Sequence, residues 1–260
     1  MNHVHHAEAL DVLSSIEESS VDLVYVDPPF GTGVKRTLAH RKGTSIISKM
    51  GYGDSYQDYI GFLRPHLEGI KRVLKETGTM YLHLDTRWVH YAKVACDEVF
   101  GRECFLNEII WAYDYGGRGK KKWPPKHDNI LVYVKDPKKH VFNWDSIDRI
   151  PYMVPSLQKD KARAEAGKVP TDVWWMSIVG TQSKERNGYP TQKPVKLVER
   201  CIIASSPEDG VVLDCFAGSG TTGAAALKSG RNFILVDRND DAIKVMKERF
   251  HSVTDLTWHV

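Results

Sequence analysis

The last third of this chain contains a glycine-rich turn between two short predicted apolar strands, and this arrangement restricts the fold more than any other segment does. Residues 211–214 form the first strand, the turn reads LDCFAGSGTTG over residues 213–223, and the second strand, residues 233–236, ends in Asp237. Three glycines have the spacing G-x-G-x-x-G: Gly218, Gly220 and Gly223. The order of strand, glycine turn, helix, strand and acid predicts a nucleotide-binding unit within a doubly wound, Rossmann-like α/β sheet.

The surroundings of this turn favour one nucleotide cofactor over another. A dinucleotide site usually opens its chain and has a second nucleotide-binding half, whereas only 37 residues follow Gly223 here. An acid, Asp214, also stands directly before the glycines. We therefore favour S-adenosylmethionine over NAD as the ligand, and an NAD-linked oxidoreductase remains an alternative.

A second motif follows another predicted strand, Val21–Val26. The residues Asp27-Pro28-Pro29-Phe30 end that strand, because proline cannot continue a central ladder. A carboxylate and a carbonyl side by side can accept two hydrogens from one amino group, and an aromatic ring beside them can stack on a base. A plain turn is the alternative interpretation of this motif.

The composition is that of an ordinary globular protein, with 36 Lys+Arg against 33 Asp+Glu and 42% hydrophobic residues. No segment has the features of a signal peptide or a membrane span. Four cysteines without a CxxC pair predict reduced thiols and a cytoplasmic protein. His3, His5 and His6 could chelate a metal, but we expect a frayed polar terminus and no metal.

Periodicity and capping residues predict further elements on either side of these motifs. An amphipathic helix carries Ile60, Leu63, Leu67, Ile70 and Leu74, contains Pro65 and ends at Gly78. A second helix is capped by Thr86 and ended by Gly101. The other predicted helices are Val195–Ala204 and Thr221–Lys228, and the other predicted strands are 79–84, Glu108–Ala112 and Ile130–Val134. Residues 31–55 predict a mobile loop, and residues from about 140 to 190 predict an irregular region.

Four segments together resemble one enzyme family. VDLVYVDPPFGTG, YLHLDTRWVHY, YPTQKPVKLVERCI and LDCFAGSGTTGAAA are similar to segments of the DNA amino-methyltransferases, which act on adenine N6 or cytosine N4. The catalytic motif D/N/S-P-P-Y/F precedes the cofactor loop, as in the circularly permuted β-class. The resemblance implies one methyltransferase domain, residues 1–260, with a small target-recognition insertion at about residues 111–190.

The resemblance also assigns roles to individual residues. Asp27 and the Pro28 carbonyl would hold the target amine, Pro29 would fix the backbone, and Phe30 would stack on the flipped base. Asp237 would bind the ribose of S-adenosylmethionine. The other cofactor contacts it implies are Thr191, Lys193, Pro194, Asp214, Phe216, Gly218, Ser219, Gly220 and Thr221. Gly31 departs from the asparagine that many members have there, which puts any contact of that amide in doubt.

Basic segments predict contact with double-stranded DNA. Eight Lys/Arg and two acids stand between Arg118 and Lys139, with Trp123 as a stacking face, and the loop 35–49 is a second basic segment. The predicted phosphate contacts are Lys35, Arg36, Arg118, Lys120, Lys121, Lys122 and Lys126. A solvated charged face is the alternative. Trp174 and Trp175 are expected to pack rather than to contact bases.

The expected activity is methyl transfer from S-adenosylmethionine to the N6 amine of adenine in DNA. Asp27 favours adenine, because the cytosine-N4 members more often have serine at that position. A cytosine-N4 enzyme and a catalytically silent DNA-binding module are the alternatives. The resemblance brings a homodimer and a separate restriction endonuclease as further partners, and no membrane.

Overall fold

The computed structural model describes residues 1–29, 36–42, 45–52, 58–117 and 119–260, with only the backbone of 36–42 and 45–52. Nine strands form its main sheet: β1 (Asn2–His6), β2 (Val21–Val26), β5 (Leu74–Leu84), β6 (Phe105–Ala112), β7 (His127–Val134), β8 (Val173–Trp175), β9 (Val211–Asp214), β10 (Asn232–Asp237) and β11 (Leu256–His259). Their order is β11-β1-β10-β9-β2-β5-β7-β6-β8. The expectation of a doubly wound α/β sheet is confirmed.

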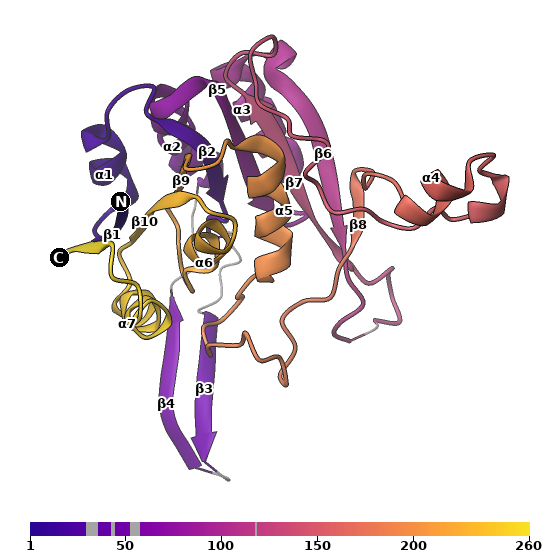
Figure 1. Cartoon of the computed structure of the whole chain (residues 1–260). Helices are drawn as coiled ribbons and strands as arrows, with labels where there is room; N and C mark the ends of the chain where they lie inside the picture. Colours follow the sequence, from indigo (N-terminus) through magenta and orange to yellow (C-terminus); the bar gives the residue numbers. More distant parts are fainter. Residues whose placement is uncertain (30–35, 43–44, 53–57, 118) are drawn as a thin grey trace.

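Helices cover both faces of this sheet (Figure 1). One face carries α1 (Ala9–Ser15), α2 (Tyr59–Val73) and α3 (Val89–Phe100), and the other carries α5 (Val195–Ser205), α6 (Thr221–Lys228) and α7 (Asp240–Arg249). Residues alternate between the two cores along each strand, so Val24 and Val26 pack under the first set of helices and Leu23 and Tyr25 under the second. β2 is buried along its whole length, as a central strand of such a sheet must be.

The sheet is parallel from β11 to β5, and β7 reverses the direction. β7 pairs antiparallel with β5, with Leu84 opposite Asn129 and Thr79 opposite Val134. The start of β7 therefore lies at the carboxyl end of β5. The connection between β6 and β7, residues 113–126, returns to the edge of the sheet where the parallel strands end.

This reversal divides the basic segment that the sequence presents as one. Lys120, Lys121 and Lys122 precede β7 and lie at the carboxyl edge, whereas Lys135 follows it and donates to the Leu74 carbonyl oxygen at the opposite edge (2.7 Å). Lys139 lies 3.3 Å from Glu76 and 3.1 Å from Asp136, also at that far edge. Only the first half of the segment can face a ligand bound at the carboxyl edge.

The prediction of an unstructured loop at 31–55 is wrong for two stretches. β3 (Arg36–Lys42) and β4 (Ser45–Tyr52) pair antiparallel as a separate two-stranded sheet that stands apart from the main one (Figure 1). The β-branched pair in SIISKMGY was the available signal. Phe30, Gly31 and Lys35 lie outside the described residues, as does Arg118, and only the backbone of Arg36 is described.

The frayed N-terminus is also a wrong prediction, since β1 pairs parallel with β10 and with β11. α2 runs through Pro65 but ends at Val73, and Leu74 begins β5, so Gly78 lies within a strand. A side chain at Gly78 would collide with Leu74 and with the Lys75 carbonyl oxygen. α3 begins at Val89 behind Trp88, with no cap from Thr86, and ends at Gly101 as predicted.

The segment from 140 to 190 is mostly irregular, as expected, apart from α4 (Lys161–Ala166) and β8. The proposed insertion at 111–190 nevertheless contains β7, which pairs with β5 inside the main sheet. Among the described residues, no helix is both long enough and apolar enough to cross a membrane.

Candidate active site

A pocket of about 620 Å³ opens at the carboxyl edge of the sheet, where β1, β10, β9 and β2 end. β9 and β2 are neighbours although nearly 190 residues separate them, and the chain leaves this pair in opposite directions. Ligands of open α/β sheets bind at such a switch point. The volume lies within the range of about 300–1,000 Å³ that small-molecule sites occupy.

The glycine turn after β9 is held in shape by the acid that ends β10. Gly218 has φ +48°, and its amide donates to Asp237 Oδ2 (2.7 Å). The other oxygen of Asp237 accepts the Asn239 amide (2.9 Å). Burial raises the pKa of Asp237. Each oxygen keeps a further lone pair, so this carboxylate can still accept hydrogen bonds from a diol.

Asp214 shapes the same turn from its other end. Its side chain is buried and accepts the Thr222 hydroxyl (2.5 Å) and the Phe216 amide (3.0 Å). Burial raises the pKa of Asp214 to about 7, and these two hydrogen bonds oppose that rise. The carboxyl group therefore pins the start of α6 to the end of β9.

A second segment, residues 187–194, is fastened onto the glycine turn from outside. The side-chain Nδ2 of Asn187 donates to the Ser219 carbonyl oxygen (3.1 Å), and the Thr221 hydroxyl donates to the Lys193 carbonyl oxygen (3.2 Å). Tyr189 packs directly against Gly218, where a side chain would come within 3.0 Å of the ring. These contacts bring the YPTQKP segment to the pocket that the glycine turn forms.

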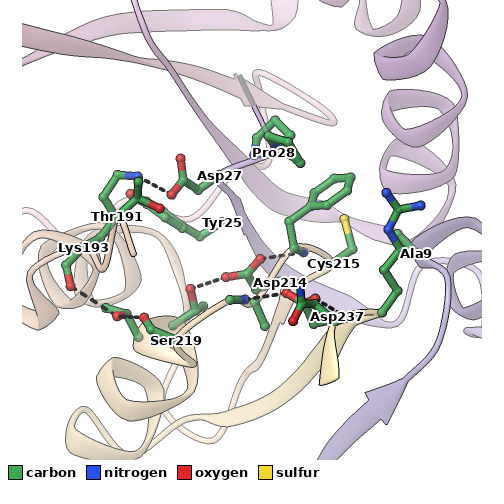
Figure 2. A pocket seen from close by; sticks show the side chains of 18 of the residues that line it. Ala9, Tyr25, Asp27, Pro28, Thr191, Lys193, Asp214, Cys215, Ser219 and Asp237 are labelled. Atoms are coloured by element: carbon green, nitrogen blue, oxygen red, sulfur yellow. Dashed lines mark hydrogen bonds and ion pairs between the residues drawn. The ribbon is translucent and has the colours of Figure 1, made fainter. Parts of the chain in front are cut away.

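The side chain of Lys193 reaches from that segment to the end of β2. Its ammonium group forms a short ion pair with Asp27 Oδ2, and Figure 2 shows the two side chains directed toward one another. Asp27 Oδ1 is buried and has no hydrogen-bond partner among the described residues. A buried acceptor without a partner is costly, and here it lies in the wall of the pocket.

Aromatic rings form another part of the wall. His66 from α2 lies 5.1 Å from the Phe216 ring and 4.7 Å from the Phe62 ring, measured between ring centroids. Burial lowers the pKa of His66, which favours its neutral form. No pattern in the sequence marks Phe62 and His66 as site residues, because a helical period shows which face is buried but not which residues that face contacts.

A chain of buried polar groups lies behind the catalytic motif. The Tyr25 hydroxyl lies 2.7 Å from His83 Nδ1, and His83 Nε2 lies 3.2 Å from Asp128 Oδ2. Tyr113 donates to the other oxygen of Asp128 (3.0 Å). The hydrogen bonds of His83 and Tyr113 lower the pKa of Asp128 although its burial acts to raise that pKa. These hydrogen bonds fix Tyr25, which lines the pocket. No motif in the sequence marks Tyr25 as a site residue.

Most of the residues predicted for the site line this one pocket. They are Asp27, Pro28, Pro29, Thr191, Lys193, Asp214, Phe216, Gly218, Ser219, Thr221 and Asp237. Pro194 and Gly220 do not line it. Pro194 precedes α5, and Gly220, with φ +72°, faces Met246 and Phe250 of the core.

The predicted DNA contacts differ among themselves. Lys120, Lys121 and Lys122 are exposed and form no ion pair within the described part of the chain. The Lys126 ammonium group instead donates to the Tyr115 carbonyl oxygen and, at 2.9 Å, to that of Gly116, so it closes its own loop. Among the aromatic residues, Trp174 packs as predicted, whereas Trp123 and Trp175 are exposed.

Solved structures with the same architecture are those of DNA methyltransferases. The chain is similar to PvuII DNA methyltransferase (cytosine-N4-specific) with a TM-score of 0.71 and 17% identity, covering 98% of this chain and 88% of that one. The chain is also similar to the crystal structure of the M1.HpyAVI–SAM complex, with a TM-score of 0.65 and 20% identity. The match covers 96% of this chain and 99% of that one. At these identities the likeness establishes the fold class, that of the Rossmann-like DNA methyltransferases.

Sequence comparison then gives the family. The family model described as DNA methylase, for N6 and N4 methyltransferases, matches residues 21–248. Type II methyltransferase M.HpaI of Haemophilus parainfluenzae is 34% identical over 95% of this chain and 73% of its own length. DNA adenine methyltransferase YhdJ of Escherichia coli (strain K12) is 33% identical over 92% of this chain and 79% of its own length. The chain therefore belongs to the S-adenosylmethionine-dependent DNA amino-methyltransferase family, as its motifs predict.

Proposed function

We propose that this enzyme transfers a methyl group to the N6 amine of adenine in double-stranded DNA. The observation that carries the proposal is Asp27 Oδ1, which is buried in the wall of the pocket and accepts no hydrogen bond from the residues that the structure describes. An amino group of a base is a donor that such an acceptor requires. The glycine turn, which the family uses for its cofactor, lines the same pocket.

The pocket fits S-adenosylmethionine in both shape and charge. Asp237 keeps lone pairs for the ribose hydroxyls, and the rings of Phe62, His66 and Phe216 offer flat faces for the adenine. The acidic wall complements the positive sulfonium. When bound, this cofactor supplies an electrophilic methyl group.

The residues of the chain act on the target amine. Its lone pair is delocalised into the base, so it is a weak nucleophile until hydrogen bonds localise that pair on nitrogen. We assign one hydrogen bond to Asp27 Oδ1 and the second to the Pro28 carbonyl oxygen. Lys193 holds Asp27 through its other oxygen, which positions the carboxylate before the base arrives. After transfer, Asp27 Oδ1 is placed to receive the proton that the amine loses.

The base must leave the duplex to reach the pocket, which costs a few kcal/mol of unstacking. We propose that residues 113–126 and the other irregular parts of 111–190 contact the DNA around it. Lys120, Lys121 and Lys122 lie between β6 and β7 at the carboxyl edge of the sheet and form no ion pair with the residues that the structure describes, and Trp123 offers an exposed face. Residues 1–260 act as one methyltransferase domain in this proposal.

Adenine is favoured over cytosine by the relatives. The similar protein YhdJ is named a DNA adenine methyltransferase at 33% identity, whereas the likeness to a cytosine-N4 enzyme, at 17%, concerns the fold. Mass spectrometry of nucleosides from methylated DNA tests the choice. N6-methyladenine is the expected product. Detection of N4-methylcytosine in the absence of N6-methyladenine would show that cytosine, and not adenine, is the target base.

The proposal has three further parts, of which the first two rest on the resemblance and the third on the four cysteines without a CxxC pair. These parts are a homodimer, a partner restriction endonuclease and a cytoplasmic location. Light scattering of the purified chain tests the homodimer. A measured molecular mass of 29.5 kDa, that of one chain, would contradict a homodimer.

A further inference from the structure

Three histidines from the two ends of the sequence meet near the edge of the main sheet. In the parallel pair β1–β11, His5 lies opposite His259, and His3 is two residues earlier on β1. Side chains alternate along a strand, so His3 and His5 share one face, while Val4 joins the core on the other. His259 lies on the same face as His5, because Trp258 packs with the core of Val4. Figure 1 shows the two chain ends near each other.

The ring nitrogens are within reach of a single ion. One nitrogen of each histidine lies within 4.8 Å of the other two. His3 Nδ1 and His259 Nε2 are 3.0 Å apart, and the rings of His5 and His259 stack with centroids 4.1 Å apart. Tetrahedral zinc with Zn–N bonds of about 2.0–2.1 Å places its ligand nitrogens about 3.4 Å from one another. The exposed ring of His259 can turn to complete that arrangement.

The charge state of the cluster suits a cation. Burial lowers the pKa of His5 to about 4 and also lowers the pKa of His3, and the neighbouring rings add to both shifts. Neutral imidazoles keep the lone pairs that metals bind. The short contact between His3 and His259 needs a hydrogen on one of its two nitrogens, and a metal ion takes the place of that proton.

We propose that His3, His5 and His259 form a binding site for one divalent transition-metal ion of the zinc class. Imidazole ligands suit such ions, and a water molecule can supply a fourth ligand. The third histidine of the cluster is therefore His259 and not His6, which stands 253 positions earlier in the sequence. The ion joins the last strand of the chain to the first, and it stabilises the fold because the unfolded chain does not hold the three rings together.

The histidine next to the cluster provides a matched control. His6 is adjacent to His5 on β1 but points to the other face, where its Nε2 lies 3.4 Å from Asp240. The variants His5→Ala, His259→Ala and His6→Ala are compared with the unsubstituted full chain. Zinc affinity is measured by calorimetric titration, and the melting temperature with and without zinc is a second measurement. The four cysteines are all buried, so thiols do not compete in the folded protein.

The unsubstituted chain is expected to bind one zinc ion and to melt at a higher temperature with zinc. His5→Ala and His259→Ala are each expected to weaken binding at least tenfold, and His6→Ala to leave it unchanged. His259→Ala should keep its methylation rate, which shows that it folds. Parental zinc affinity in His259→Ala, an equal loss in His6→Ala, or no saturable binding at millimolar zinc would each overturn the site.

Discussion

The pocket and the stretch of the carboxyl edge that we propose to face DNA are built in opposite ways. In the pocket, Asp214, Asp237 and Lys193 all have partners within the chain, and these partners fix their positions. At the edge, Lys120–Lys122 and Trp123 are exposed and form no ion pair in the described part of the chain. The groups of the pocket are therefore positioned before a substrate arrives, whereas under the proposed function the exposed side chains of the edge would acquire their partners from DNA.

The largest effect should come from the acceptor of the pocket. Asp27→Ala removes both the amine acceptor and the partner of Lys193, and the rate of methyl transfer should fall by at least about 100-fold. Binding of S-adenosylmethionine should remain measurable by calorimetry. Asp11→Asn, an acid in the wall of the same pocket, is the control and should keep most of the activity. A rate above a tenth of the parental value in Asp27→Ala would remove Asp27 from the mechanism.

The buried polar chain behind the pocket should show the next largest effect, on stability. His83 is fully buried and contacts Tyr25 and Asp128 through its two nitrogens. His83→Ala takes this partner from the Tyr25 hydroxyl and from Asp128 Oδ2 and leaves a cavity beside them, which should lower the free energy of unfolding by about 3 kcal/mol.

Urea denaturation measures this change, with the exposed His251→Ala expected to stay within about 0.5 kcal/mol of the parent. Equal stability of the two variants would show that the pocket does not depend on internal partners in the way described above.

The lysines of the edge should affect DNA binding alone. A triple change of Lys120, Lys121 and Lys122 to Gln should weaken binding about tenfold at fixed salt and reduce the slope of log K against log salt by roughly 0.9 per lost phosphate contact. Stability should not change, since these exposed side chains have no ion pair to lose within the described part of the chain.

The far edge of the sheet supplies the control for this change. The double change of Lys138 and Lys139 to Gln lies beyond the other end of β7 and should leave the salt slope as it is. If both sets of substitutions reduced the slope equally, the separation of the basic segment into two halves would have no meaning for DNA.

The smallest expected effect is the pH dependence of stability due to Asp214. Burial raises its pKa to about 7 in the folded chain, against about 3.9 for an unperturbed Asp. Between these values the folded state binds one more proton than the unfolded state. The contribution of the Asp214 carboxyl group to the free energy of unfolding is therefore full below pH 4. It is lost as pH rises toward 7, by up to about 1.4 kcal/mol per pH unit.

Asp214→Asn cannot ionise, so its free energy of unfolding should decline less between pH 5 and 7 than that of the parent. Urea titrations at the two pH values give the difference, which we expect to be about 1 kcal/mol or more. Parallel declines in parent and variant would mean that the carboxyl group is already ionised at pH 5.

The sequence predicts the parts of the molecule that short-range patterns determine. The strands ending at Asp27, Asp214 and Asp237, and the glycine turn between the last two, follow from periodicity and from residues that only a turn tolerates. The resemblance adds the permuted order and brings Lys193 to the site. These elements carry most of the pocket.

The rest depends on contacts between distant residues. The terminal strands β1 and β11 are polar and short; β1 takes its hydrogen-bond partners from β10 and β11, and β11 takes its partners from β1. The Tyr25–His83–Asp128 chain likewise joins three strands. No local pattern reveals such pairings, which is why the N-terminus was expected to fray.

The adjacency of β2 and β9 has a consequence for how the protein is made. On a ribosome adding about 5–20 residues per second, roughly 10–40 s pass between the synthesis of Val26 and that of Val211. During that interval one side of β2 has no neighbouring strand, and an open hydrophobic strand invites pairing with other chains. The order that places Asp27 beside the glycine turn thus leaves one edge of β2 open to pairing with other chains until β9 has been made.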